Sequence, residues 1–416
     1  MFRLLSRRAA TLVGKLSFPP TNPGISRFSS GGSDGVPVAV QIVNYALNLA
    51  RSQKSDESYG QALLVMEQGL ANFRREENVQ DNAAGVVLLG MSTLLSERED
   101  LGGAREKLLQ VVDSTHSCSA VKVAAVEALA AINLEMGQDA ASSTVADSCP
   151  HMLADKDDTS DHMFVRARAV KGLVELVSGN LEAAQMCFTG PEYEKMVSDE
   201  GISGNVPLSH GEFLHTCGKL SLAKEFYQKA LDTSLTEDFS EQSSSFSAAN
   251  MSPKEVSLGA MCALGQLATH TGNFQDAEDM LMKALTKAEE LYGSKHPKVG
   301  VILTSLGIMF GQKATMERSS SLLIQEGLYR RAIEVLKAPS MDHEGLQVER
   351  SDIIALARGG YGETLGVQQN RKGEGERMKK WAESVWRNRR LSLAQALDIS
   401  EPSKVAVIDS RISRVL

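Results

Sequence analysis

The sequence predicts an all-α protein, a right-handed superhelical solenoid of stacked antiparallel helix pairs. Three observations predict it: a small residue recurs along the chain, a glycine precedes most of these residues by five positions, and the helices between them carry an apolar stripe of helical period. The small residues are Ala62, Ala104, Ser142, Ala184, Ala223, Ala277 and Ala332, at spacings of 42, 38, 42, 39, 54 and 55. Only 5% of the residues are aromatic, which also favours helix over sheet.

The small residues mark the places where the two helices of a pair are expected to cross. Helices approach closely only where no bulky side chain intervenes, and overpacking there costs about 1–3 kcal/mol. A glycine with positive φ is expected to end the first helix of most pairs, at Gly137, Gly179, Gly218, Gly272 and Gly327. Apolar residues three positions before the small residue are expected to fill the joint, at Tyr59, Leu101, Leu181, Leu220, Phe274 and Tyr329.

Two units carry the fullest version of this pattern. One contains Gly211, Leu214, Gly218, Leu220, Ala223, Tyr227 and Ala230, and the other contains Gly172, Gly179, Leu181, Ala184 and Phe188. In this order the residues resemble the tetratricopeptide repeat, which implies a protein-binding solenoid. The loop Gly293-x-x-His296-Pro297, followed by Leu306-Gly307, is similar to the loop between the repeats of kinesin light chains. From Ile42 to about Leu336 the chain resembles a member of the tetratricopeptide superfamily, of the plant mitochondrial type.

Other helical solenoids have similar periods. Armadillo and HEAT repeats recur at about 40 residues, and pentatricopeptide repeats at about 35. The glycine, aromatic residue and alanine around the turn favour tetratricopeptide units over the first two. The irregular, long spacing and the acidic body disfavour the third, which reads RNA.

The chain divides into three predicted parts. Residues 1–30 form a mitochondrial transit peptide, residues 31–340 an array of about seven degenerate repeats, and residues 341–416 capping helices with a basic segment and a tail. The repeat around Ser142 is weak. Two insertions explain the long spacings. Residues 234–253 are serine-rich and expected to be flexible, and residues 311–325 could extend the first helix of their unit.

The first thirty residues are basic and contain no acid. Their cations are Arg3, Arg7, Arg8, Lys15 and Arg27, and the first acidic residue is Asp34. This pattern is typical of an organelle transit peptide cleaved near Phe28, with a disordered basic tail as the alternative, and it predicts a protein of the mitochondrial matrix or facing it. Removing the five cations from the formal charge of −8 leaves −13. Such an acidic body repels nucleic acid and anionic lipid.

Catalytic and cofactor-binding motifs are absent from the sequence. It contains no phosphate-binding loop, nucleophile elbow or HExxH helix. His116-x-Cys118 and Cys149-Pro-His151 have the ligand types of a zinc site but only one residue between the members of each pair, so no metal site is expected. Gly359–Gly362 is expected to form a turn between helices. We therefore expect no enzymatic activity and no cofactor.

Candidate binding residues lie at the two ends of the array. Near the N-terminus, Asn44, Asn48 and Arg51 would line the first helix, and Asn48 is the one retained amide of the kind with which kinesin light chains hold peptide backbones. Near the C-terminus, Arg371–Arg390 carries eight cations and both tryptophans. It predicts a patch for an acidic partner, RNA or a cardiolipin-rich membrane, with Lys379, Lys380, Trp386, Arg389 and Arg390 as candidates. Alternatively, this segment only caps the solenoid, with Trp381 packed inward.

The predicted function is that of a non-enzymatic scaffold. Stacked helix pairs leave a concave groove that presents an extended surface, so we expect partner proteins to bind there during assembly or maintenance of a mitochondrial complex. The longest apolar stretch, Ala83–Leu95, falls short of the roughly 18 residues of a membrane span, which leaves only peripheral membrane contact. The alternative function is an RNA-associated mitochondrial factor, linked for instance to the ribosome, that uses the basic C-terminal helix.

Overall fold

The computed structural model describes residues 35–75, 81–114, 117–154, 161–197, 202–234, 246–318, 320–341, 348–398 and 406–416. The transit peptide predicted over residues 1–30, with its cleavage near Phe28, lies outside this part of the chain. So do His116 and residues 235–245 of the serine-rich insertion.

Eighteen α-helices lie within the described part of the chain, with two 3-10 turns and two short strands. The α-helices are α2 (Gly35–Gln53), α3 (Asp56–Arg75), α4 (Asp81–Glu97), α5 (Leu101–Asp113), α6 (Ser119–Glu135), α7 (Asp139–Ala154), α8 (Asp161–Val177), α9 (Leu181–Cys187), α10 (Pro191–Val197), α11 (Asn205–Thr216), α12 (Leu220–Thr233), α13 (Pro253–His270), α14 (Phe274–Tyr292), α15 (Pro297–Glu317), α16 (Leu322–Val335), α17 (Ser351–Gly366), α18 (Lys372–Val385) and α19 (Leu393–Leu397). The other elements are η2 (Ala249–Met251), η3 (Gln369–Arg371), β1 (Ile408–Asp409) and β2 (Arg414–Val415).

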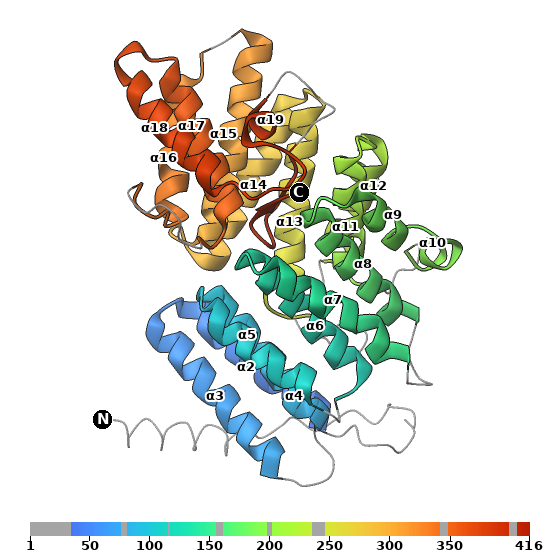
Figure 1. The fold of residues 1–416 in the computed structure, drawn as a ribbon. Coiled ribbons are helices and arrows are strands. Elements are labelled where there is room, and N and C mark those ends of the chain that lie inside the picture. The colour runs from blue at the N-terminus through green and yellow to red at the C-terminus, as the bar shows by residue number, and fades with distance from the viewer. Residues whose placement is uncertain are drawn as a thin grey trace.

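The helices stack as consecutive pairs, as the sequence predicted. The pairs are α2 with α3, α4 with α5, α6 with α7, α8 with α9, α11 with α12, α13 with α14, α15 with α16, and α17 with α18. The first helix of each pair also contacts the first helix of the next pair, so these first helices form a continuous inner row (Figure 1). The last pair, which the sequence assigned to the cap, packs in the same manner as the others.

The two rows of helices differ in how they are buried. On α14, a second helix, six residues on one stripe are buried, whereas α13, a first helix, is buried on nearly every side. The first helices α6, α11, α15 and α17 are also buried almost all round over most of their length. A helix that is apolar on all sides belongs in a core. The inner faces of these helices are therefore covered by protein.

The small residues lie where the sequence placed them, between the helices of each pair. Ala62, Ala104, Ala184, Ala223, Ala277 and Ala332 are all completely buried, and so is Ser142. The Ser142 hydroxyl donates a hydrogen bond of 2.8 Å to the Ala130 carbonyl, so serine can replace alanine there without leaving a buried polar group unsatisfied.

Four of the five predicted turn glycines have the expected backbone conformation. Gly137, Gly179, Gly218 and Gly272 have φ between +73° and +78° and follow the first helix of their pair. The prediction for Gly327 is wrong, because this glycine lies inside α16. The insertion around it lengthens both helices of the pair: α15 continues to Glu317, the turn uses Arg318 with φ +52°, and α16 begins at Leu322.

The loop that resembles kinesin light chains starts α15 by side-chain capping. Gly293 has φ +89°, and the Lys298 amide donates to the His296 ring nitrogen Nδ1 over 3.2 Å. Pro297 is the first helical residue, a position where its missing N–H costs nothing. The Gly-x-x-His-Pro pattern therefore encodes a turn followed by a helix start.

The Gly359–Gly362 segment is not the turn that the sequence predicted, because it lies within α17. A Cβ atom on Gly360 would come within 2.6 Å of the Tyr329 ring of α16, and one on Gly362 within 2.8 Å of the Gly375 carbonyl of α18. These glycines let α17 approach its two neighbours closely.

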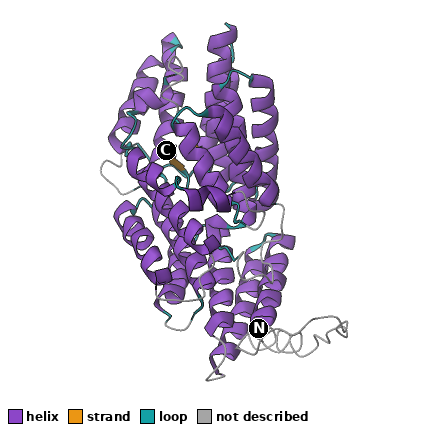
Figure 2. Cartoon of the chain, turned by 90° about the vertical axis from the view of Figure 1, so that its right-hand side faces the viewer, coloured by secondary structure: helices purple, strands orange, loops and turns teal. Residues whose placement is uncertain are grey.

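The solenoid curls so that its two halves face each other across the C-terminal residues. Figure 1 shows the C-terminus in the middle of the molecule, and Figure 2 shows the short strands among helices. The strands pair antiparallel, with Ile408 opposite Val415 and Asp409 opposite Arg414. The halves also contact each other directly: Lys337 pairs with Glu99 over 2.6 Å, and Lys54 donates to the Glu290 carbonyl.

Among the described residues, α15 is the one helix long and apolar enough to span a membrane by length and composition. In its most apolar window, 61% of the residues are buried inside the fold, as expected of a core helix.

Paired glycine substitutions test the close approach of α16 and α17. Gly360→Ala places a methyl group against the Tyr329 ring and is expected to lower the free energy of unfolding by about 1–3 kcal/mol. Gly327→Ala is the matched control: it is also a helical glycine but has nothing within 4 Å, so it is expected to stabilise the protein by about 0.5–1 kcal/mol. Urea unfolding of the purified variants measures both. Equal effects would contradict the close packing.

Candidate peptide-binding face

The inner row of helices holds a short hairpin of the chain's own C-terminal region. We call residues 406–416 the tail. From Val407 to Leu416 every residue of the tail is buried, including Asp409, Arg411 and Arg414. The residues around it are polar side chains on five first helices or beside them: Glu135, Asn205, Ser209, Glu212, Gln266, Lys298 and Asp352. We call this set, with the tail's contacts to it, the tail site.

Several contacts in the tail site go to the tail's main chain. The Gln266 side chain makes two of them: its Nε2 donates to the Ile408 carbonyl over 2.9 Å, and its Oε1 accepts from the Ile408 N–H over 2.8 Å. Lys298 Nζ donates to the carbonyls of Ser410, over 2.8 Å, and Arg411. Such contacts fix an extended segment in place whatever its side chains are.

The Arg411 guanidinium is the centre of a fully buried polar cluster. It donates to Glu212 over 2.6 Å, to Asp409 over 2.8 Å, to Asn205 over 3.0 Å and to Ser209 over 3.1 Å. One positive charge thus faces two carboxylates. Burial, with the nearby Asp409, raises the pKa of Glu212 well above its ordinary value despite the guanidinium.

Arg414 joins the two halves of the solenoid. Its Nε donates to Asp352 of α17 over 2.6 Å, and its Nη1 donates to Asp139 of α7 over 2.7 Å and to the Leu134 carbonyl of α6 over 2.9 Å. Its Nη2 donates to the second oxygen of Asp139 over 3.3 Å, which makes four hydrogen bonds, one more than the three donors of a lysine could supply. The end of the tail is held by Asn388, which donates to the Val415 carbonyl, and by Arg390, which donates to Leu416 O over 2.6 Å.

A second internal segment, residues 246–252, is buried beside the tail. The sequence predicted a flexible loop over 234–253, but residues 246–252 are fully enclosed. Their main chain is held by side chains: Arg166 donates to the Phe246 carbonyl over 2.7 Å, the Ala249 N–H donates to Thr93 over 2.8 Å, and Asn205 donates to the Met251 carbonyl over 2.7 Å. The serine-rich composition of the insertion suggested solvent exposure. Residues 246–252 are buried instead, because Phe246 and Met251 provide apolar side chains that pack inside the fold.

Burial and charge act in opposite directions on two glutamates near the tail. At Glu135, burial favours the neutral form, but the charges of Lys298 and Arg350 outweigh it and lower the pKa to about 2. At Glu255, burial dominates and raises the pKa to about 7, although Lys298 Nζ lies 3.5 Å away. Glu135 thus has two cations beside it, Lys298 and Arg350, whereas Glu255 has Lys298.

Polar contacts decide whether the tail remains bound. Burying the tail's apolar side chains contributes about 10 kcal/mol, at about 2 kcal/mol for each of Val407, Ile408, Ile412, Val415 and Leu416. Ordering its eleven residues costs about 16 kcal/mol, at about 1.5 kcal/mol each. The ordering cost therefore exceeds the apolar gain by about 6 kcal/mol. Hydrogen bonds to charged groups, at about 1.5–3 kcal/mol each, must supply the difference.

The candidates predicted near the N-terminus lie on α2, at the far end of the solenoid from α17 and α18 (Figure 1). Arg51 forms a salt bridge with Glu97 of α4. Asn44 is partly buried and Asn48 is exposed. The structure thus places these three residues away from the tail site.

The basic C-terminal segment is divided between several roles. Trp381 is buried on α18, with the Arg358 guanidinium 3.8 Å from its ring centroid, and Lys379 lies 3.9 Å from Glu363. Trp386 Nε1 donates to the Leu391 carbonyl over 2.7 Å. Lys380 and Arg389 are exposed, whereas Arg390 contacts the tail. Of the five candidates, Lys380 and Arg389 are thus the exposed ones.

No sequence motif indicated the residues that make the hydrogen bonds of the tail site, among them Gln266, Lys298, Glu212, Arg411 and Arg414. One pattern in the sequence does indicate that the inner face is covered. The segment from Val121 to Leu134 is apolar on all sides of the helix, so its inner face must be covered. The identity of the cover could not be read from a local pattern.

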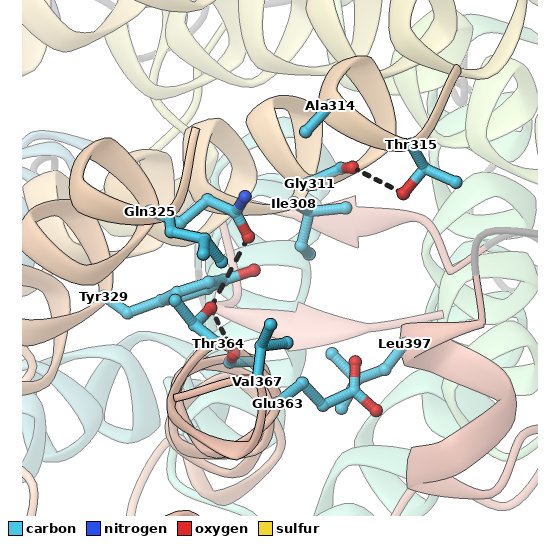
Figure 3. Close-up of a pocket in the computed structure, with 12 residues that line it drawn as sticks. Ile308, Gly311, Ala314, Thr315, Gln325, Tyr329, Glu363, Thr364, Val367 and Leu397 are labelled. Atoms are coloured by element: carbon cyan, nitrogen blue, oxygen red, sulfur yellow. Dashed lines mark hydrogen bonds between the residues drawn. The ribbon is translucent and has the colours of Figure 1, made fainter. Parts of the chain in front are cut away.

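A cavity of about 260 Å³ lies between α15, α16, α17 and α19 (Figure 3). Its walls are mainly apolar, and the ionisable groups among the residues that line it are Glu363 and Tyr329. Burial raises the pKa of both. Thr364 donates to the Gly360 carbonyl over 2.9 Å and contacts Gln325 over 3.4 Å. The lining therefore offers no paired nucleophile and base.

Comparisons with known proteins agree with the helix pairs. Residues 257–338, which span most of α13 through α16, match the family model described as tetratricopeptide repeat. No curated protein matches the chain. A solved tetratricopeptide repeat protein from Parabacteroides merdae is 10% identical, covering 76% of this chain and 99% of its own, with a TM-score of 0.38. Yeast Tom70 is 12% identical, covering 87% and 95%, with a TM-score of 0.28. The fold and the matched units define an all-helical repeat protein.

Stability should depend on pH through Glu255. Its pKa is about 7 in the fold and about 4.5 without burial, so its stabilising contribution is complete below about pH 4.5 and is lost as the pH rises through 7. Relative to Glu255→Gln, the native protein is expected to lose about 3 kcal/mol of unfolding free energy over that range. Urea titrations between about pH 5 and 8 measure the difference. The exposed Glu383→Gln variant is the control, and parallel pH profiles for all three proteins would disprove the assignment.

The Arg411 cluster yields a second stability prediction. Arg411→Met leaves two buried carboxylates without their cation and is expected to cost about 3–5 kcal/mol in urea unfolding. The triple variant with Glu212→Gln and Asp409→Asn removes those charges and should recover most of the loss. Arg377→Met, at an exposed position on α18, serves as the control. An unchanged free energy of unfolding in the Arg411→Met variant would show that the tail is not inserted in solution.

Proposed function

We propose that this protein is a non-enzymatic interaction scaffold that holds a short segment of a partner protein on its inner face. The observation that carries the proposal is the pairing of Gln266 with both main-chain groups of Ile408, together with the Lys298 contacts to two further carbonyls. A helix that binds an extended main chain through an amide side chain recognises peptides with any side chain at that point. The tail is such a peptide.

The form of recognition differs from that implied by the kinesin light chain resemblance. At the positions that would carry the peptide-binding amide, this chain has Ala263 and Ser305, and the Ser305 hydroxyl is bonded to the Val301 carbonyl of its own helix. Gln266 lies about one helical turn after Ala263, on the inner side of α13. We therefore assign the amide contact to Gln266.

Mitochondrial location is the second part of the proposal. It is supported by the basic, acid-free first thirty residues and by the acidic remainder, a combination typical of imported proteins. The scaffold would then act in assembly or maintenance of a complex in the matrix or facing it. The RNA-associated alternative requires a continuous basic surface. Lys379 and Arg390 of the predicted patch are already engaged with Glu363 and Leu416.

Crosslinking mass spectrometry on mitochondria from cells that express the tagged full chain tests this function. We expect reproducible crosslinks to one or a few proteins, unchanged by nuclease treatment. The control variant Arg3→Gln/Arg7→Gln/Arg8→Gln should fail to enter the organelle and should lose these crosslinks. Recovery of the native protein free of partners, or outside mitochondria, would refute the proposal. Loss of the partners after nuclease treatment would favour the RNA-associated alternative.

A further inference from the structure

We infer that the tail is a removable internal occupant, and that a partner protein enters the same site with a short hairpin that carries two arginines three residues apart and apolar residues in its two strands. The inference rests on the proposed function and names the partner's chemistry. It follows from the contacts between the tail site and the tail. Arg411 and Arg414 each occupy a separate acidic position, in a hairpin that also buries Asp409, Ser410 and Ser413.

The two acidic positions require arginine. Arg411 donates in several directions at once, to Glu212, Asn205 and Ser209. Arg414 donates to carboxylates on both halves of the solenoid and to a main-chain carbonyl. Only a guanidinium presents enough donors in the right directions, so a lysine at either position would leave buried acceptors unsatisfied.

The apolar residues of the tail pack in two directions. Val407, Ile412 and Leu416 belong to the same apolar cluster as α8 and α11, whereas Ile408 and Val415 belong to the cluster of α15 and α17. An occupant must therefore supply apolar side chains to both halves as well as the two arginines. The antiparallel pairing of Ile408 with Val415 and of Asp409 with Arg414 limits the accepted segments to short hairpins.

The solenoid keeps its own packing without the tail. Each first helix that contacts the tail also packs against its pair partner and against the next first helix. The tail pairs with itself through strands of only two residues, and its contacts to the inner row are made by side chains. The ordering cost of the tail exceeds its apolar gain, as estimated above. Its release therefore exposes a face that carries both apolar and acidic side chains, without dismantling the helix pairs.

Covalent attachment gives the tail an advantage over any free peptide. Seven residues separate Asp398 of the C-terminal helices from Ala406, and a short tether corresponds to an effective concentration of about 1 mM. A free peptide of micromolar affinity for the open site would then bind the intact chain about 1,000-fold more weakly than a chain with the tether cut. The covalent attachment thus sets the affinity that a partner segment needs in order to displace the tail.

The test uses the full chain with a protease recognition sequence placed between Asp398 and Ala406. The chain is folded first and cut afterwards, so the tail is present during folding. The probe is a fluorescent synthetic peptide of residues 406–416, and its binding is followed by anisotropy. Comparison peptides carry Arg411→Gln with Arg414→Gln, or Arg411→Lys with Arg414→Lys. A scrambled peptide of the same composition is the control.

We expect the probe to bind the cut protein saturably and at least 100-fold more weakly to the uncut protein. Both arginine-substituted peptides should lose at least 100-fold in affinity, and the scrambled peptide should not bind. Failure of the probe to exchange into a cut protein that retains its circular dichroism would show that the tail is a permanent part of the core. Equal binding of the substituted peptides would overturn the arginine requirement.

A second copy of this chain is the other occupant that the experiment detects. Size-exclusion chromatography with light scattering on the uncut protein is expected to show a monomer. A dimer that dissociates on addition of the probe would show that the occupant is the tail of a second copy and not a partner protein.

The outcomes of the two experiments also distinguish the proposed function from this inference. Peptide exchange in vitro without crosslinked partners in mitochondria would defeat only the scaffold function. Crosslinked partners without exchange would defeat only this inference.

Discussion

The buried carboxylate of Glu135, at the end of α6, connects the parts of the fold that the repeats alone do not connect. It accepts hydrogen bonds from Arg350 before α17 over 2.9 Å, from Ser413 of the tail over 3.2 Å and from Asn250 of the second buried segment over 3.3 Å. Lys298 of α15 lies 3.8 Å away. A buried charge is tolerated only when its partners are all present. The closed form of the solenoid therefore requires that the segment before α17, the tail and the second buried segment all contact Glu135.

A helical-repeat protein normally leaves its inner row open to solvent or to a ligand, and this chain does not. Its first helices are apolar on the side that would face the groove, so an open groove would expose a large apolar surface. The tail and residues 246–252 cover that surface. Their buried polar groups add specificity rather than a large gain in stability, because desolvation offsets much of the attraction of each ion pair. The occupant's main chain and two arginines fix its register on the inner row.

Local sequence patterns predicted the repeat units. The tail site could not be predicted, because its residues lie far apart in the sequence. The crossing alanines and the glycines from Gly137 to Gly272 could be found because each unit repeats the same short-range chemistry. Gly327 was wrongly predicted to be a turn residue, because glycine also occurs inside helices, as it does here in α16. The tail site combines residues such as Gln266 and Ile408, 142 positions apart, or Asp139 and Arg414, 275 positions apart. No periodicity marks such pairs, and the apolar segment from Val121 to Leu134 was the one local sign that the inner face is covered.

In the proposed function, recognition and folding share the same contacts, and this has a thermodynamic consequence. Because the tail and a partner segment would compete for Gln266, Lys298 and the acidic positions, any change that strengthens the tail's contacts must weaken the apparent affinity for a partner by the same factor. A partner must also supply contacts to both halves, since Arg414 bridges Asp139 and Asp352. A segment that filled only one acidic position would leave the other half unsupported. The closed solenoid thus selects partners by whether they can replace the whole tail.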